Sequence, residues 1–460
     1  MNHRLLILAL LFAGCAAPNP QGYQTAELDL FYSTEVTAAA VHKPQEDTST
    51  FDVVDDAEPI ELTGDFSLEL AMDLARTNAI SVLQAADAHL AASADLQIVT
   101  TDSYYPHLSV GAQMGRVRGR VQGTDGTFLD DIDKQNTNLG MSLRLDIDLA
   151  TATHGIAAAR QSIRASTWDW IAAELAAETA AALFYHDLLE AGARVEIAEA
   201  AVDRASAYHA LSEARFQAGA GLEADVLRAL AHLAEARQNR VQALAARGHA
   251  STQLAELLGL DPLRPLEPTD SLVPRELVED IVEVDVAAHP LLEASRARLA
   301  AAAAKLKEER ASWFLPELIV DAGFNDFGSE YGELEDQETL TAAISWDLSP
   351  SVLARADRAH ADHSRARHDA EAEKRRVESA LVRAQISALA SEELLEATQA
   401  RVEASRAAVA LERTRHEEGD ALLIELLDAE VSLLRAETAS AAAICSHNRA
   451  QHLLRQALGG

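Results

Sequence analysis

What this chain lacks excludes several classes of protein. Aromatic residues make up only 5% of its 460 residues, and it contains 12 prolines and 21 glycines. So few aromatic and turn residues are untypical of a β-sandwich and favour long helices. The 2 cysteines, Cys15 and Cys445, are too few for a disulfide framework. We expect Cys445, which lies in an alanine-rich stretch, to be a small buried side chain.

Basic residues and catalytic motifs are scarce as well. Lysine and arginine number 39 against 73 aspartates and glutamates, which gives a formal net charge of −34. Such a charge repels nucleic acid, so we predict no nucleic-acid partner. The chain has no Gly-Lys-Ser/Thr phosphate loop, no Gly-x-Ser-x-Gly element and no His-Glu-x-x-His element. We therefore predict that it is not an enzyme and needs no cofactor or metal.

The N-terminus carries an export signal. Met1–Arg4 bears positive charge, and the uncharged Leu5–Phe12 is too short to span a bilayer. Ala13-Gly14-Cys15 follows and resembles a bacterial lipoprotein cleavage box, which predicts a signal peptide at 1–14 and lipid on Cys15. The alternative is an ordinary signal peptide with an incidental cysteine. Residues 15–64 are acidic and lack sustained periodicity, so we interpret them as a lipid-anchored N-terminal arm.

The rest of the chain is an internal duplication. Residues 215–227 align with residues 415–427, and the alignment continues without a gap to Leu258-Gly259 and Leu458-Gly459. A repeat of this length indicates a doubled domain rather than a solenoid. We predict one repeat at 65–263, a linker at 264–283 and a second repeat at 284–460.

Within each repeat the hydrophobic period changes from helical to alternating. Helical spacing begins after Ser67, a candidate N-cap, and ends at Tyr104-Tyr105-Pro106; the second repeat runs in the same way from about Val284 to Pro316. Strands of about ten residues follow, with apolar side chains at every second position: Leu108, Val110, Ala112 and Met114; Leu139, Met141, Leu143, Leu145 and Ile147; Leu318, Val320, Ala322 and Phe324; Leu340, Ala342, Ile344, Trp346 and Leu348. With acidic loops predicted at Gly123–Gln135 and Ser329–Gln337, each repeat holds one β-hairpin.

Very long helices follow the hairpins. The tracts Ala150–Ala218 and Ser349–Glu418 would each extend about 100 Å at 1.5 Å per residue. Shorter return helices are predicted at Leu222–Leu258 and Leu422–Leu458, joined to the outgoing helices by turns at Gly219 and Gly419, because glycine suits a helix C-terminus. The pattern predicts a bundle of long antiparallel helices.

The strands have the length and alternation of an outer-membrane barrel wall. No segment after the signal is long and apolar enough for a membrane-spanning helix, so a spanning part would have to be a β-barrel. Four strands cannot close a barrel alone, which favours an oligomer. A water-soluble sheet with one face on a protein core shows the same alternation and is the alternative. Aromatic residues near the strand ends suit a membrane interface or a core: Tyr104, Tyr105, Trp313, Phe314 and Trp346.

From Phe66 to Gly460 the chain resembles the TolC-like outer-membrane factors. The matching segments are Leu68–Asn78, His289-Pro290, Pro106-His107-Leu108, Pro316-Glu317-Leu318, Arg215-Phe216 with Gly219, and Gly419 with Leu422-Leu423 and Leu426-Leu427-Asp428-Ala429. Their duplicated order carries the resemblance. The chain departs from the family pattern at Ala79, where proline is usual, and at the hairpin exits Ile147-Asp148-Leu149 and Trp346-Asp347-Leu348.

The resemblance implies a mainly α fold with transmembrane β structure. Long antiparallel helical hairpins would form an α-barrel in the periplasm, and two β-hairpins per chain would contribute to a 12-stranded β-barrel of a homotrimer in the outer membrane of a Gram-negative bacterium. It implies a passive exit duct of a tripartite efflux or type I secretion system. The implied partners are outer membrane lipid, a periplasmic adaptor and an inner-membrane pump or secretion ATPase. The exported substrate is not predicted.

The resemblance also implies two functional regions at the Gly-centred turns. The predicted adaptor-docking tip comprises Gly219, Gly221, Leu222, Gly419, Ala421 and Leu422. The predicted periplasmic gate comprises Glu425 and Asp428, six and nine residues after Gly419 and on one helix face. The corresponding residues of the first repeat are Asp225 and Arg228, which can neutralise each other. Alternatively, the glycines merely cap helices and the acids merely face solvent.

Two rival interpretations stay open. His360 and His363 have the i, i+3 spacing of metal ligands, but the run Arg355–Arg376 is charged throughout and favours a solvated helix face. A soluble periplasmic coiled-coil scaffold is the better rival, because alanine, glutamate, arginine and leucine dominate the helices. Such a scaffold would not need β-hairpins.

Overall fold

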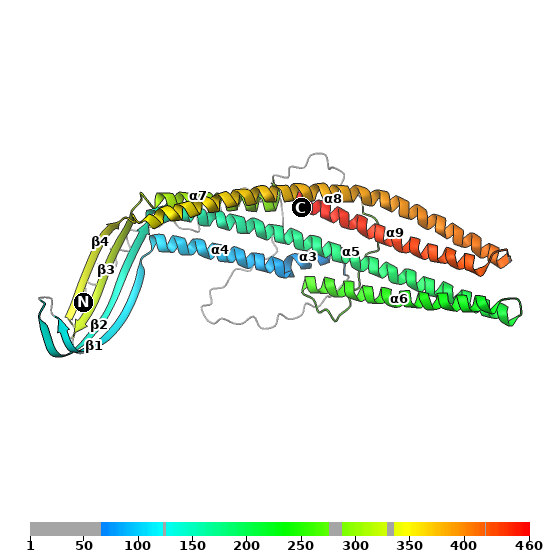
Figure 1. Ribbon diagram of the computed structural model, residues 1–460, viewed down its shortest axis with the longest axis horizontal. Helices are drawn as coiled ribbons and strands as arrows, with labels where there is room; N and C mark the ends of the chain where they lie inside the picture. The colour runs from blue at the N-terminus through cyan, green and yellow to red at the C-terminus, as the bar shows by residue number, and fades with distance from the viewer. Residues whose placement is uncertain (1–65, 123–125, 276–287, 329–334, 419) are drawn as a thin grey trace. The chain divides into compact units, whose positions relative to one another are not determined.

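The computed structural model describes residues 66–122, 126–275, 288–328, 335–418 and 420–460 (Figure 1). The chain divides into two units, Met1–Glu58 and Pro59–Gly460, and every described residue belongs to the second. The predicted signal peptide, Cys15, the N-terminal arm and Gly419 therefore lie outside the described residues. Among the helices in the described ranges, none combines the length and apolar composition that crossing a bilayer would require.

The first helical segment is divided in two. Helix α3, Leu68–Asn78, starts as predicted at Ser67, whose hydroxyl accepts a hydrogen bond from the Leu70 amide at 3.3 Å. The prediction of one continuous helical segment up to Tyr104 was wrong. Ala79 has extended backbone (ψ 129°) and interrupts the helix, and a second helix, α4, covers Ile80–Tyr104. The Ala79 carbonyl accepts from the Leu83 amide and so starts the second helix. The break therefore falls at the residue where the chain departs from the family pattern.

Four antiparallel strands form one sheet in the order β1-β2-β3-β4 (Figure 1). They are β1 (His107–Gln122), β2 (Phe128–Asp148), β3 (Glu317–Gly328) and β4 (Glu335–Ser345). The predicted length of about ten residues was wrong for the first hairpin, whose strands have 16 and 21 residues. The predicted loop at Gly123–Gln135 is therefore mostly strand from Phe128 onward, and the last strand ends at Ser345, before Trp346.

The strand register collects the alternating apolar side chains on one face. Val110 lies opposite Met141, and Met141 lies opposite Phe324. Val320 pairs with both Leu145 and Ala342 in the same way. Because side chains of directly paired residues point to the same side of a sheet, one face is apolar across all four strands. The predicted alternation is thus confirmed, and it extends across both hairpins.

The remaining helices run along one another as two hairpins. After a π-helical turn at Thr151–Gly155, α5 covers Ile156–Gln217 and packs against α6, Glu223–Leu258. In the second repeat α7, Pro290–Ala311, precedes β3, and α8, Pro350–Glu418, packs against α9, Leu423–Leu458. Helix α5 also contacts α4, α7 and α9. The predicted long helices and their returns are confirmed to within a few residues.

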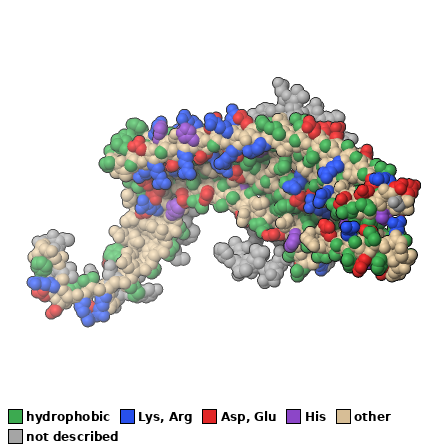
Figure 2. Space-filling model, turned by 45° about the vertical axis from the view of Figure 1, so that its right-hand side comes forward, with side chains coloured by type: hydrophobic (Ala, Val, Ile, Leu, Met, Phe, Trp, Pro, Cys, Tyr) green, Lys and Arg blue, Asp and Glu red, His purple; other side chains and the backbone are tan. Residues whose placement is uncertain are grey.

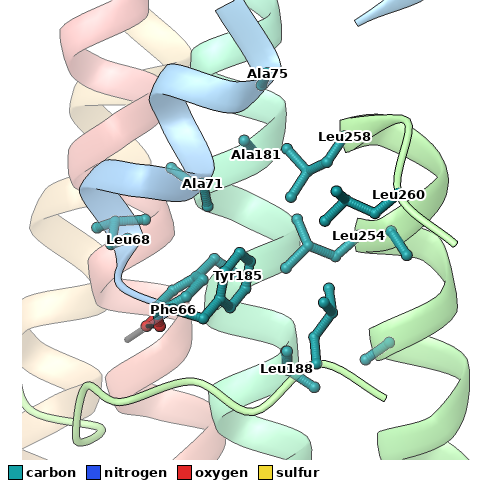
Figure 3. Packing of buried hydrophobic residues seen from close by; sticks show 14 of the residues in the cluster. Phe66, Leu68, Ala71, Ala75, Ala181, Tyr185, Leu188, Leu254, Leu258 and Leu260 are labelled. Atoms are coloured by element: carbon teal, nitrogen blue, oxygen red, sulfur yellow. Dashed lines mark hydrogen bonds between the residues drawn. The ribbon is translucent and has the colours of Figure 1, made fainter. Parts of the chain in front are cut away.

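The main core surrounds the middle of α5 (Figure 3). Tyr185 of α5 and Leu254 and Leu258 of α6 are fully buried, together with alanines of α3 and α5. Burying one such large side chain contributes about 1.5–3 kcal/mol. The many alanines let the helix backbones approach closely, so few large residues suffice. Cys445 is also fully buried, as predicted, and its thiol donates to the His186 carbonyl at 3.4 Å.

Part of the predicted linker holds the two repeats together. The Tyr185 hydroxyl lies 2.7 Å from Asp270 Oδ2, and the same carboxylate accepts from the Leu68 amide at 3.0 Å. Farther along, the Arg275 amide donates to Asn448 Oδ1 at 2.9 Å, and Asn448 Nδ2 donates to the Val273 carbonyl at 2.8 Å. Residues 264–275 thereby join α3 and α5 of the first repeat to α9 of the second.

Candidate functional site: the tips of the helical hairpins

The turn between α5 and α6 has the geometry expected of a glycine-centred cap. Gly219 has φ +74°, a left-handed conformation that L side chains rarely adopt. The Ala220 amide donates to the Arg215 carbonyl at 2.9 Å. Gly221 is also constrained, because an added Cβ would lie 3.1 Å from the Phe216 nitrogen. The turn itself therefore requires both glycines of the first predicted tip, whether or not the tip also docks a partner.

The second turn repeats this arrangement. The Asp420 amide donates to the Arg415 carbonyl at 2.8 Å, as Ala220 does to Arg215. Leu422 has extended backbone and starts α9, as Leu222 starts α6. Leu222 is 66% exposed and Leu422 is 69% exposed. Each turn thus presents one large apolar side chain to solvent.

A polar contact bridges the two tips. Arg215 Nη1 donates to His416 Nε2 at 2.9 Å, and His416 Nδ1 lies 3.1 Å from the Ala421 carbonyl. Both distances fit a neutral imidazole that accepts at Nε2 and donates at Nδ1. The sequence alignment brings Arg215 opposite Arg415, and nothing in it indicates that Arg215 contacts His416. The contact holds the two turns side by side.

A buried charge network lies a few turns above the tips. Glu430 of α9 is only 4% exposed. Its Oε1 accepts from the Tyr208 hydroxyl at 2.7 Å and its Oε2 accepts from Arg204 Nε at 2.9 Å, both on α5. Arg413 of α8 donates to the same hydroxyl at 3.1 Å. Burial, followed by the bond to Glu430, raises the pKa of Tyr208 to about 12. Sequence reasoning missed this network.

The predicted gate residues lie on the exposed side of α9. Leu423, Leu426 and Leu427 pack with Tyr208 and Ala229 in a small core, and Glu425 and Asp428 project from the opposite side. In the first repeat Arg228 Nη1 bonds Asp225 Oδ1 at 3.2 Å. The first-repeat pair is therefore neutralised within the chain, as the sequence suggested, whereas the second-repeat position carries two carboxylates.

A groove of about 650 Å³ runs between α5, α6 and α9 above the tips. Arginines and a histidine line it alongside two acids: Arg194, Arg204, Arg435, His232, Glu235 and Glu430. Apolar side chains of the same three helices, mostly alanines, line most of the rest of the groove. The groove lies next to the buried Glu430 network, so an occupant would contact the helices that the network joins.

In the part of the chain that the structure describes, the one group of side chains with the spacing of metal ligands already has other partners. His360 is exposed on α8, and within the described ranges the candidate ligand group is a different one, Asp187, Glu190 and Cys445. Arg449 bonds Asp187 at 2.8 Å, and Arg194 pairs with Glu190. Both carboxylates thus already have cationic partners, and burial raises the pKa of the Cys445 thiol.

Long antiparallel hairpins, exposed apolar tips and a sheet with one apolar face define a subunit of an export channel. Residues 71–260 and 286–460 match the outer membrane efflux protein family, and the chain belongs to that family. The protein is an outer-membrane efflux channel of a Gram-negative bacterium, with its helical part in the periplasm. The resemblance drawn from the sequence is confirmed, and the soluble scaffold is not favoured.

Known proteins of this kind match most of the chain. OpmQ, the pyoverdine export outer membrane protein of Pseudomonas putida, is 27% identical over an alignment of 481 residues, covering 99% of this chain and 96% of OpmQ. The outer-membrane channel OprN is 25% identical with a TM-score of 0.71, covering 85% of this chain and 90% of OprN. The CmeC outer membrane channel of Campylobacter jejuni shares the fold, with a TM-score of 0.78 at 16% identity over 92% of this chain and 94% of CmeC.

Proposed function

We propose that three copies of the chain close into one duct, which serves as the passive exit of a pump complex. The observation that carries this proposal is the sheet. Within the described residues, β1 and β4 each pair with one neighbour only, and one face of the sheet is apolar. Unpaired strand edges are not tolerated in hydrocarbon, so these two edges need partners from further copies.

Exposed apolar side chains on two helices support the same assembly. On α6 they include Leu227, Leu230, Val241 and Leu244, and on α8 they include Val382, Ile386, Leu389 and Leu411. Successive members are 3, 4, 11 or 22 residues apart, and each of these steps keeps them along one stripe of the helix. Stripes of this kind are normally covered. A neighbouring copy would cover them along the helical part while it pairs with the strand edges.

The hairpin tips are proposed to dock a periplasmic adaptor, which links the duct to an inner-membrane pump or secretion ATPase. Leu222 and Leu422 supply the exposed apolar contacts, and the nearby groove supplies polar ones. The related OpmQ exports pyoverdine, which favours a small secreted molecule as cargo. We keep the predicted division into repeats at 65–263 and 284–460 as part of this proposal.

The docking tip can be tested with charge at the two exposed leucines. Leu222→Arg and Leu422→Arg should together abolish export, because arginine cannot fill an apolar pocket of the adaptor. Folding should be unaffected, because neither side chain is buried; Gly221 is a poorer choice, because its substitution strains the turn. Native mass of the detergent-extracted protein should still show a trimer. Leu263→Arg, at another strongly exposed site, serves as the control. Normal export by the double variant would place docking elsewhere.

The N-terminal arm is proposed to hold the duct at the membrane through lipid on Cys15. Two or three acyl chains on one terminus anchor a protein far more firmly than one. The mature chain should therefore begin at Cys15 and exceed its peptide mass by the mass of those chains. Intact mass spectrometry measures this directly, with Cys15→Ser as the comparison. An unmodified mature chain that starts at another residue would contradict the prediction.

A further inference from the structure

The two edge strands of the sheet carry opposite charge at corresponding heights. On β1, Arg116 and Arg118 continue the face that holds Val110 and Met114. Both guanidinium groups bond the single carboxylate of Asp133, at 2.6 and 2.9 Å, so one positive charge is left over. Figure 2 shows basic side chains gathered toward the end of the sheet away from the helices.

On β4 the same face ends in acids. Glu338 lies opposite Phe324, which lies opposite Met141, which lies opposite Val110. Glu338 and Asp336 are therefore on the apolar face, just beyond Leu340, as Arg116 and Arg118 are just beyond Met114. Asp326 opposite Asp336 makes this edge more acidic still. The two edges of one subunit are thus complementary in both apolar pattern and charge.

Side-chain alternation restricts how these edges can meet. Even-numbered residues of both β1 and β4 lie on the apolar face, so an antiparallel pairing that keeps this face continuous must join even residues to even residues. The allowed registers then differ by steps of two residues. Only some of them also place the start of β1 beside the end of β4, the two strand ends that lie next to the helices.

One register satisfies every position. Placing Val110 opposite Ile344 sets Ala112 against Ala342 and Met114 against Leu340, followed by Arg116 against Glu338 and Arg118 against Asp336. It also sets His107, the first residue of β1, against residue 347, two residues past the end of β4. A shift of two residues in one direction places Arg116 opposite Leu340, and a shift in the other direction places Met114 opposite Glu338. Either shift therefore puts a charged side chain opposite an apolar one.

We propose that β1 of one subunit pairs with β4 of the next in the register that joins Val110 to Ile344, locked by the ion pair Arg116–Glu338. The inference rests on the proposed trimer and adds its interface. In each junction the surplus positive charge on β1 faces the acids on β4. The apolar band then continues unbroken around the closed sheet, and the charged positions form a belt at its edge farther from the helices.

Paired cysteines test the register directly. Val110 is 76% exposed and Ile344 is 60% exposed, and the natural Cys445 is buried. Oxidation of the Val110→Cys, Ile344→Cys double variant should convert most of the protein into covalent trimers, because directly opposed Cβ atoms lie within disulfide reach. Neither single variant should cross-link. The matched control is Val110→Cys with Ala342→Cys, shifted by two residues on the same face, which should cross-link at least tenfold less.

A double-mutant cycle tests the ion pair in the assembled channel. Arg116→Gln and Glu338→Gln should each lower the temperature at which trimers dissociate in detergent, and the double variant should be little worse than either single one. Glu335→Gln, on the other face of β4, should have no effect. Additive losses would overturn the ion pair, and a loss from Arg116→Gln alone would assign this arginine to its bond with Asp133 in the same subunit instead. Stronger cross-linking of the shifted pair would overturn the register while trimers persist. A natural protein that is not trimeric would instead refute the proposed function.

Discussion

A Glu430→Gln channel should unfold at a clearly lower temperature than the natural protein, with a loss of about 3–5 kcal/mol per subunit. The carboxylate is 4% exposed and joins Tyr208 and Arg204 of α5 to α9. Removing its charge leaves Arg204, whose side chain is 26% exposed, without its closest anion and with only Glu437, 3.9 Å away, as an acidic partner. The cost comes mainly from this poorly compensated cation, because a largely buried charge that loses its partner regains little hydration.

The same change should loosen the tip. Arg413 of α8 also bonds Tyr208, so the network ties α5 to both helices of the second hairpin. Its loss should let the tips separate and raise the conductance of channels in planar bilayers. Tyr208→Phe removes the hydrogen bonds of this hydroxyl to Glu430 and Arg413 but keeps the Arg204–Glu430 ion pair, so it should cost less, about 1.5–3 kcal/mol. Glu199→Gln, an exposed acid of α5, should change neither property. Equal melting temperatures for Glu430→Gln and Glu199→Gln would refute the role of the network.

The elements that periodicity predicts well are those with one apolar face and one polar face. The alternation from Leu139 to Ile147 predicted a strand, and the odd-numbered residues of this segment lie on the apolar face of β2. Gly219 predicted a helix end because its position requires a left-handed backbone, and its φ is +74°. In these cases one local physical requirement determines both the residue type and the structure, so a single sequence suffices.

The outer half of the first hairpin could not be predicted in this way. Residues 128–135 are rich in acids and resemble a loop, yet they form the first part of β2. Ion pairs stabilise this part: Asp133 binds Arg116 and Arg118, and Asp130 binds Arg120 at 2.8 Å. Such pairing depends on which strand lies alongside, which alternation within one strand does not reveal.

Contacts between distant residues were equally hidden. Glu430 lies 226 residues from Arg204 and 222 from Tyr208 in the chain. In the sequence it is one of 73 acidic residues, and nothing in its neighbourhood separates it from Glu425 or Asp428. Only the packing of α9 on α5 shows that Glu430 points inward while the other two point outward. This difference separates a structural acid from candidates for a gate.

Glu425 and Asp428 are proposed to form a ring of negative charge at the periplasmic mouth. Two exposed carboxylates in each of three copies would give six around one axis. A plainer explanation exists for Glu425, which stands in the first turn of α9, where the helix dipole favours an acid whatever the channel does. The helix-dipole explanation does not cover Asp428, and it predicts no effect on ion passage. A measurement of ion selectivity therefore distinguishes the charged ring from the helix-dipole explanation.

Neutralising this ring with Glu425→Gln and Asp428→Asn should reduce the preference of the channel for cations by about tenfold at low salt, because charge at a narrow mouth concentrates counter-ions. The difference should shrink at 1 M salt, where the screening length falls to about 3 Å from about 10 Å at 0.1 M. Reversal potentials in planar bilayers with a salt gradient measure the preference. The matched control is Asp225→Asn with Arg228→Gln, the corresponding pair of the first repeat, which is neutralised within the chain at 3.2 Å and should leave selectivity unchanged. If well-formed trimers of the Glu425, Asp428 variant keep the natural selectivity at low salt, the two acids are ordinary surface residues and the constriction lies elsewhere.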